Sequence, residues 1–205
     1  MTIAARTVAQ LEQFDHASER LLLRMGGPSF DSGDGSPVEV PPMTDAEYLW
    51  EPVAGCWSVR RREDGPGHRA TKLLGGGPWG RDATPNSPYP PPFTTLAWRL
   101  SHLTEMLVLR ADHTSGTHSM ERTDFHSSGD AAGAIAAWET ATAAWRRTLL
   151  ACDDEVLDTV GYSTFPYGSD ADDPFIDVVW WVNQEIVHHG AEIALLRDLY
   201  REMHP

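Results

Sequence analysis

Four long segments of this chain repeat apolar residues at the spacing of an α-helix, and this pattern limits which folds the chain can adopt. The repeats cover residues 7–24, 94–116, 130–151 and 174–202. Helices with one apolar face bury that face against other elements. No segment alternates apolar and polar residues in the way that a half-buried strand does. We therefore predict an all-α chain, folded as an antiparallel four-helix bundle with long crossover loops.

The segments between these helices are rich in glycine and proline. Residues 26–43 are predicted to form a loop, and residues 44–47 match a capping box, which predicts a short helix. Residues 51–92 lack periodicity but contain large aromatic side chains, which favour a packed loop over a flexible linker. These aromatic anchors are Trp57, Trp79 and Tyr89. Before the last helix, Asp173 is predicted to be the N-cap and Pro174 the first helical residue.

Length and charge narrow the class of protein further. A chain of 205 residues can bury a sizeable core, so residues 1–205 are predicted to form a single domain. The formal net charge of −14 argues against nucleic acid and anionic membranes as partners, because both attract basic patches. No apolar run predicts a membrane span, and the first residues do not resemble a signal peptide. With only Cys56 and Cys152, a reducing cytoplasmic setting is expected.

The last predicted helix carries a pair of potential metal ligands. Glu185 and His189 are four residues apart, so their side chains project from the same face of the helix. A carboxylate and an imidazole in this arrangement supply half of a divalent-metal site. The helix is predicted to be largely buried, and buried ionisable groups need a partner or a metal. The prediction of burial rests on Trp180, Trp181, Val182, Ile186, Val187, Ile193, Leu195 and Leu196.

His102, within the second long helix, is the candidate third ligand. A lone histidine between leucines is more often a core residue hydrogen-bonded to a backbone carbonyl than a ligand. Helical bundles, however, build metal sites from side chains on facing helices. Two imidazoles and one carboxylate would leave positions open for water or substrate, as catalytic zinc sites do. His102, Glu185 and His189 are therefore predicted to bind one divalent metal ion.

His188 raises an alternative, because Glu185 and His188 form a Glu-x-x-His pair of the kind found in di-iron bundles. Such centres need two of these pairs and two further glutamates, and the sequence contains no second pair. His188 and His189 also point about 100° apart around a helix, so they are not expected to bind the same ion. His188 is predicted to lie at the surface or beside a ligand.

The remaining polar candidates have simpler predicted roles. His113, His118 and His126 follow the second helix and are predicted to be solvated. Glu105, one turn after the candidate histidine ligand, could orient that imidazole or approach the metal. Cys56 lies between a glycine and a tryptophan and is predicted to be a small packed residue, not a nucleophile.

Several short motifs give the chain a family resemblance. They are residues 98–103 (Trp-Arg-Leu-Ser-His-Leu) on the second helix, residues 185–192 (Glu-Ile-Val-His-His-Gly-Ala-Glu) on the last, and residues 47–52 followed by 56–60 in the connection. In this order and at this separation, they resemble the DinB-like superfamily. These proteins are bacterial four-helix bundles related to metal-dependent thiol transferases, and the resemblance covers most of the chain.

The resemblance implies a metal site with one histidine from the second helix and a His-x-x-x-His pair from the last. His102 matches the first position and His189 the third, whereas Glu185 stands where the family usually has histidine. The glutamate keeps a potential ligand but changes its charge. A carboxylate with two histidines suits zinc, nickel, manganese or iron, and zinc and nickel are favoured here.

The resemblance also implies a cofactor. Characterised relatives use a low-molecular-weight thiol, such as mycothiol or bacillithiol, and a metal-bound thiol is deprotonated and so activated at neutral pH. All but one of the 16 basic residues are arginine, a bias typical of GC-rich bacterial genomes and compatible with a mycothiol-using bacterium.

Two functional hypotheses follow. In the first, the chain is a metal-dependent thiol transferase or hydrolase, in which the bound cation activates a thiol or water against an electrophilic small molecule. In the second, the chain is a non-catalytic bundle, a binding or stress-response protein whose glutamate and histidines form a buried hydrogen-bonded network. Both hypotheses leave a homodimer open, because helical bundles commonly associate through helix faces.

Overall fold

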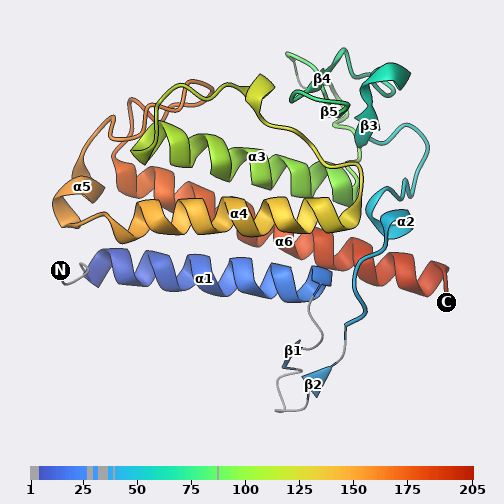
Figure 1. The fold of residues 1–205 in the computed structure, drawn as a ribbon, viewed down its shortest axis with the longest axis horizontal. Coiled ribbons are helices and arrows are strands. Elements are labelled where there is room, and N and C mark those ends of the chain that lie inside the picture. The colour runs from blue at the N-terminus through green and yellow to red at the C-terminus, as the bar shows by residue number, and fades with distance from the viewer. Residues whose placement is uncertain (1–4, 27–29, 32–36, 39, 87) are drawn as a thin grey trace.

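Four long helices that lie side by side form the frame of the molecule (Figure 1). The computed structural model describes residues 5–26, 30–31, 37–38, 40–86 and 88–205. Within these residues α3 packs against α4 and α6, and α1 packs against the same two helices. The long helices are α1 (Ala5–Gly26), α3 (Leu96–Ser115), α4 (Ala131–Leu150) and α6 (Phe175–Met203), and the short ones are α2 (Asp45–Tyr48) and α5 (Asp154–Asp158).

The long helices do not all run antiparallel to their neighbours. Figure 1 shows α1 and α6 running in one direction and α3 and α4 in the other. The pairs α1–α4 and α3–α6 are therefore antiparallel, as predicted, whereas α1–α6 and α3–α4 are parallel. Because α3 and α4 are consecutive long helices that run parallel, the segment between them, residues 116–130, returns along the length of the helices.

Side-chain caps fix where three of the helices begin. The Oγ1 of Thr95 accepts a hydrogen bond from the N–H of Trp98 at 3.2 Å, and an oxygen of Asp130 accepts one from Gly133 at 2.7 Å. Thr44 caps α2 in the same way. These caps satisfy N–H groups that have no partner within the helix, so α2, α3 and α4 begin where the sequence predicts.

The predicted cap of the last helix was wrong. Pro174 occupies the N-cap position of α6, with no side-chain capping bond, and Phe175 is the first helical residue. The carboxylate of Asp173 instead accepts a hydrogen bond from the hydroxyl of Ser169 at 2.6 Å. A competing partner in the preceding turn therefore draws Asp173 away from the helix.

The apolar faces of the long helices meet in one continuous core. Each helix contributes side chains that are almost completely buried, and α4 contributes two tryptophans. Burial of such side chains is the main stabilising contribution to a fold of this kind. Representative members are Phe14 and Leu21 of α1, Leu100, Leu103 and Leu107 of α3, Trp138 and Trp145 of α4, and Val182 and Ile186 of α6.

The connection between α2 and α3 contains a small antiparallel sheet that the sequence did not predict. Its strand order is β3–β5–β4, and Arg81 of β5 pairs with Val59 of β3 and Leu74 of β4. The chain is therefore mostly helical but not all-α. The strands of this sheet are β3 (Val59–Arg61), β4 (Lys72–Leu74) and β5 (Trp79–Ala83). A separate pair is formed by β1 (Phe30–Asp31) and β2 (Pro37–Val38), and two short 3-10 helices are η1 (Arg62–Asp64) and η2 (Arg122–Asp124).

A buried carboxylate organises this sheet. Asp82 is completely buried, and its oxygens accept hydrogen bonds from the N–H of Ser58 at 2.9 Å and of Gly67 at 2.7 Å. It also accepts one from the Nε of Arg60 at 2.8 Å. This polar network links β5 to β3 and to Gly67, and backbone pairing joins β5 to both neighbouring strands. Neither contact produces an alternating apolar pattern, so periodicity could not reveal the strands.

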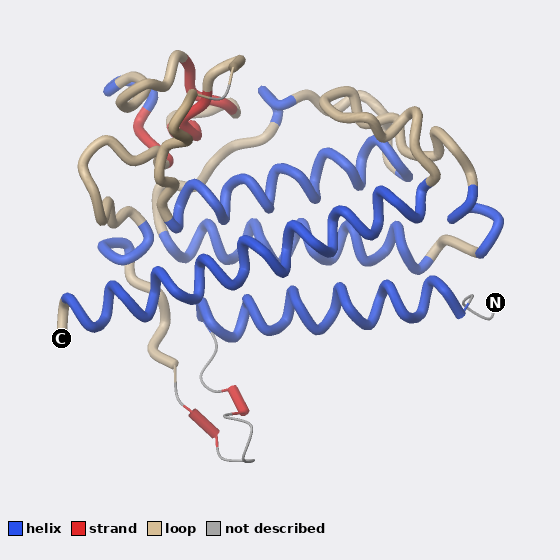
Figure 2. Tube along the Cα trace, turned by 180° about the vertical axis from the view of Figure 1, so that it is seen from behind, coloured by secondary structure: helices blue, strands red, loops and turns tan. Residues whose placement is uncertain are grey.

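The sheet lies beside the N-terminal end of α3 (Figure 2). The indole N–H of Trp98 donates to the carbonyl of Asp82 at 2.8 Å, and the N–H of Thr95 donates to the carbonyl of Trp57 at 2.9 Å. Trp57 is buried, as a packed loop requires, but Tyr89 is 94% exposed and is not an anchor. The prediction of a packed connection is thus confirmed for Trp57 and wrong for Tyr89.

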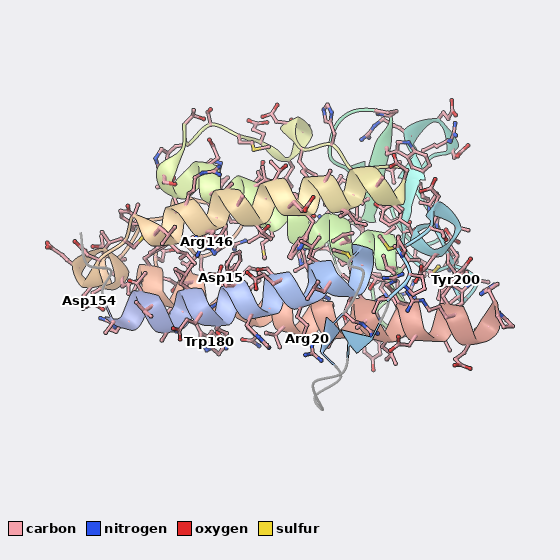
Figure 3. All side chains as sticks on the ribbon, turned by 60° about the horizontal axis from the view of Figure 1, so that its bottom comes forward. Asp15, Arg20, Arg146, Asp154, Trp180 and Tyr200 are labelled. Carbon is pink, nitrogen blue, oxygen red and sulfur yellow. The ribbon has the colours of Figure 1, made fainter. Side chains whose placement is uncertain are left out.

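One ion pair between two long helices lies at the surface. Arg146 of α4 reaches Asp15 of α1, labelled in Figure 3, with its Nε 2.9 Å from a carboxylate oxygen. Pairs this exposed contribute little to stability, typically up to about 1 kcal/mol.

No helix within the described ranges has the length and hydropathy of a membrane span.

Asp112, near the end of α3, organises the turn that follows. Its carboxylate accepts hydrogen bonds from the backbone N–H groups of Thr117 at 2.8 Å and of Ser119 and Met120 at 2.9 Å. Burial alone would raise the pKa of Asp112, but the hydrogen bonds outweigh it and lower the pKa from 3.8 to about 2.

The substitution Asp112→Asn is expected to flatten the dependence of stability on acid pH. Because the folded-state pKa lies below the unfolded one, the carboxylate contributes stability that is present above about pH 4 and lost as the pH falls toward about 2. Urea unfolding at several pH values measures the free energy of unfolding in the wild type, Asp112→Asn and the exposed control Asp64→Asn. An acid slope that Asp112→Asn leaves at the wild-type value would contradict this role.

Candidate metal centre

The fold brings the three predicted ligands together. His102 lies in the second turn of α3, and Glu185 and His189 lie one turn apart near the middle of α6. An oxygen of Glu185 is 3.1 Å from the Nε2 of His102 and 3.5 Å from the Nε2 of His189. One potential donor atom from each residue lies within 4.8 Å of the other two. The antiparallel packing of α3 on α6 produces this convergence, since the residues are far apart in sequence.

The site is recessed without being sealed. The side chains of His102, Glu185 and His189 retain 24%, 18% and 15% of their exposure, respectively. The rings of His102 and His189 meet edge to face, with centroids 5.2 Å apart, and the indole of Trp98 lies 5.4 Å from the His102 ring. The aromatic ring restricts the orientation of His102 while leaving the site in contact with solvent.

The carboxylate and the imidazoles hold each other in defined protonation states. Hydrogen bonds with His102 and His189 keep the pKa of Glu185 well below its usual range. Burial lowers the pKa of His102, which the hydrogen bond with Glu185 does not offset. At neutral pH the site therefore presents an ionised carboxylate and a neutral His102 imidazole, which donates its Nε2 proton to Glu185; a metal ion bound at Nε2 would replace that proton.

A second carboxylate orients His189. The Nδ1 of His189 lies 2.6 Å from an oxygen of Glu192, which in turn accepts a hydrogen bond from the Nε of Arg99 at 2.7 Å. Although burial opposes it, contact with Glu185 and Glu192 raises the pKa of His189. A proton held between Nδ1 and Glu192 leaves the Nε2 of His189 directed at Glu185. Metal-binding histidines commonly have such a carboxylate on their other nitrogen.

His188 lies outside the three-residue group. Its side chain is 60% exposed, its ring stacks on that of His189 at 4.7 Å, and its Nε2 is 3.5 Å from Glu192. His188, His189 and Glu192 also bring donor atoms within reach of one another, but Glu192 already binds Arg99 and the His189 Nδ1. His188 therefore lies at the surface beside a candidate ligand, as the sequence predicted.

Two predictions about neighbouring residues were wrong. His113 is buried rather than solvated, because its Nε2 is 2.8 Å from the carbonyl oxygen of Met120; His118 and His126 are exposed. Glu105 does not orient His102 but forms ion pairs with Arg81 and Arg122. Polar partners in the loops, which periodicity does not reveal, decide both positions.

The helix that carries the site is only half buried. Val182, Ile186, Ile193 and Leu196 face the core, as predicted, but four other apolar residues lie at the surface. Trp180, labelled in Figure 3, is 56% exposed, and Trp181, Val187 and Leu195 are also exposed. The boundary of the buried face could not be read from the sequence, because apolar residues lie on both the buried and the exposed face of α6.

Cys56 is a buried free thiol, and burial raises its pKa to about 11, so it is no nucleophile at neutral pH.

Sequence reasoning missed the groups that support the site. Glu192 follows His189 by three residues on α6, a spacing that could have revealed the pair. Arg99 lies three residues before His102 but binds a carboxylate on another helix, and Arg81 comes from the unpredicted strand β5. Only the tertiary structure connects these arginines to the site.

A family model described as the DinB superfamily matches residues 39–193. The chain belongs to the DinB superfamily. The match contains all three candidate ligands and the motifs that carry the resemblance, so the predicted family is confirmed. Searches of curated proteins and of solved structures found no match.

The donors of this DinB superfamily member fit a divalent ion. Ligand nitrogens and oxygens about 2.0–2.2 Å from a tetrahedral ion lie roughly 3.3–3.5 Å from one another. The observed nitrogen-to-oxygen distances of 3.1 and 3.5 Å around Glu185 are close to this spacing. Two imidazoles and a carboxylate also leave at least one coordination position open.

Proposed function

We propose that the four long helices form the helical bundle typical of the DinB superfamily and that His102, Glu185 and His189 bind one divalent cation, with zinc and nickel favoured. The observation that carries this proposal is the spacing of the Glu185 oxygen from the two Nε2 atoms. Glu185 replaces a family histidine and adds a negative charge, which reduces the net charge of an occupied site. The contact between His189 and Glu192 supports the same proposal.

We further propose that the protein is a metal-dependent transferase or hydrolase that acts on an electrophilic small molecule. A bound cation would lower the pKa of a thiol or water at its open position. A low-molecular-weight thiol such as mycothiol is the proposed nucleophile, with water as the alternative. In the transfer, the sulfur forms a bond to the electrophilic carbon and the bond to the leaving group breaks with its electron pair. The leaving group takes up the proton that the thiol releases.

Other residues of the chain hold the proposed ligands in position and provide access for the substrate. Glu192 holds the proton on the Nδ1 of His189, and Arg99 holds Glu192 in place. Trp98 restricts the ring of His102. The small-molecule partner has access through a cavity of about 340 Å³ whose wall includes His102. The acidic net charge supports the exclusion of nucleic acid as a partner.

A non-catalytic role is the second candidate, and one observation favours it. Each of the three residues already has a protein partner, since Glu185 contacts both histidines and His189 also contacts Glu192. A satisfied network of this kind can stabilise a bundle without a metal ion.

Thermal melting separates the two candidates. Protein stripped with a chelator is expected to melt at a higher temperature when zinc or nickel is added, because the ion binds only the folded site. At a metal concentration of about 100 times Kd, the free energy of unfolding is expected to rise by about 2.7 kcal/mol. For a domain of this size, that corresponds to a rise in melting temperature of roughly 5–10 °C. Metal analysis of protein purified without chelators provides the stoichiometry. No shift with any divalent ion, together with metal content near zero, would favour the non-catalytic network.

A further inference from the structure

The cavity beside His102 is bounded by parts of the chain that lie far apart in sequence. Helix α3 contributes Trp98 and His102 to its wall, strand β5 contributes Arg81, and the loop after α3 contributes Arg122. The segment that precedes α6 contributes Tyr167. With a volume of about 340 Å³, the cavity is within the range of small-molecule sites. A ligand in this cavity would lie against His102.

The cavity carries a positive charge in an acidic protein. Its wall contains the guanidinium groups of Arg81, Arg110 and Arg122 and the carboxylates of Asp82 and Glu105, which leaves one positive charge when His102 is neutral. The formal net charge of the chain is −14. Because the surrounding protein repels anions, a positive concavity of this kind marks a place where one anionic group is bound selectively.

Two of the three arginines are committed to carboxylates of the protein. Arg81 forms a buried ion pair with Glu105. Arg110 donates to the two oxygens of Asp170 at 3.0 and 3.1 Å. Both arginines are buried, and each has its charge balanced by a carboxylate of the protein.

Arg122 differs from the other two. Its nearest carboxylate oxygen, on Glu105, is 3.7 Å from its Nε, which is beyond hydrogen-bond distance. The guanidinium lies 4.2 Å from the ring centroid of Tyr167, and the side chain is 35% exposed. No hydrogen bond joins this guanidinium to another residue in the part of the chain that the structure describes. Its donors are therefore available to a ligand.

Aromatic rings cover much of the remaining wall. Trp98 lies beside His102, Tyr167 beneath Arg122, and Phe165 beside Arg110. Flat rings and guanidinium planes favour a flat, unsaturated ligand body. The fork of an arginine pairs with a carboxylate through two parallel hydrogen bonds.

We propose that this cavity binds the carboxylate of a flat, unsaturated substrate through Arg122, which places the body of the substrate against His102. The proposal rests on the proposed function and names its substrate class. One residual positive charge matches a monoanionic carboxylate, whereas a phosphate monoester would bring a second negative charge beside Glu105. Arg122 is a binding residue in this assignment.

Binding of 2-naphthoate and of its uncharged analogue 2-naphthamide tests the proposal. Titration calorimetry on chelator-stripped full-length protein is expected to show naphthoate binding at least tenfold tighter than naphthamide binding. Arg122→Gln is expected to remove that difference and leave naphthamide binding unchanged. The control Arg61→Gln removes an exposed arginine outside the cavity wall and is expected to bind naphthoate as the wild type does. Equal melting temperatures of the three proteins confirm that the variants are folded.

The proposal would be overturned by equal affinity for the acid and the amide, by an unchanged preference in Arg122→Gln, or by tighter binding of 1-naphthyl phosphate than of naphthoate. The absence of naphthoate binding at millimolar concentration would also overturn it. Because the protein is metal-free in this experiment, carboxylate binding that depends on Arg122 would survive a failure of the metal proposal. Conversely, stoichiometric metal without naphthoate binding would reject the anion pocket alone.

Discussion

The substitution His189→Ala is expected to reduce the bound metal from about one ion per chain to near zero. The variant removes one of three proposed ligands. In the wild type, the Nε2 of His189 lies 3.5 Å from an oxygen of Glu185. Two remaining donors cannot match the three-ligand sites in which proteins hold such ions. Mass-spectrometric metal analysis after purification without chelators provides the measurement.

His188→Ala is the matched control for this variant. The two histidines are adjacent on α6 and their rings stack, but His188 is exposed and lies outside the group that includes Glu185. His188→Ala is expected to keep the wild-type metal content and the wild-type gain in melting temperature. Equal metal loss in both variants, or none in either, would rule out His189 as a specific ligand.

Replacing Arg197 with alanine is expected to destabilise the protein by about 3–5 kcal/mol, the range for breaking a buried ion pair by removal of one partner. The Arg197 side chain is completely buried and donates to both oxygens of Glu47, at 2.6 and 3.0 Å. It also donates to the carbonyls of Arg24 and Pro41. The variant leaves the buried Glu47 carboxylate and both carbonyls without this donor. For a domain of this size, the melting temperature is expected to fall by roughly 6–20 °C.

A double variant and a neighbouring arginine separate the charge effect from lost packing. Arg197→Met combined with Glu47→Leu replaces both charges by apolar groups and is expected to recover most of the lost stability. Arg201→Ala removes one bond to the carbonyl of Pro41 from a partly exposed residue and is expected to cost less than about 1 kcal/mol. A loss in Arg197→Ala no greater than that in Arg201→Ala would show that the buried pair is not a principal tie between α6 and α2.

The sequence predicted those parts of the fold in which local chemistry is decisive. Thr95 and Asp130 each precede an apolar helical pattern, and each caps the helix that follows. Asp173 has the same chemistry, but Ser169 binds its carboxylate, and the helix begins without a side-chain cap. Capping residues are thus readable from sequence unless another group in the folded loop competes for them.

The sheet was not predictable in the same way. Strand β5 contains Arg81 and Asp82, two buried charged residues in a segment that periodicity assigns to no face. Their burial is tolerable only because Glu105 and Arg60 supply opposite charges from elsewhere in the chain. The predicted all-α class was wrong for this segment, because ion pairs between distant residues help to stabilise the strands and local propensity does not reveal such pairs.

For the candidate site, sequence alone determined that Glu185 and His189 share one face of a helix, because the period of the helix fixes that relation locally. That His102 lies opposite this pair was an expectation, drawn from the metal sites that bundles build on facing helices and supported by the family resemblance. The packing of α3 on α6 gives the three residues their geometry. Only the tertiary structure placed Glu192 and Arg99 behind His189 and arranged Arg122 in a cavity beside His102. Contacts between distant segments depend on how helices and loops pack, and no local spacing encodes them.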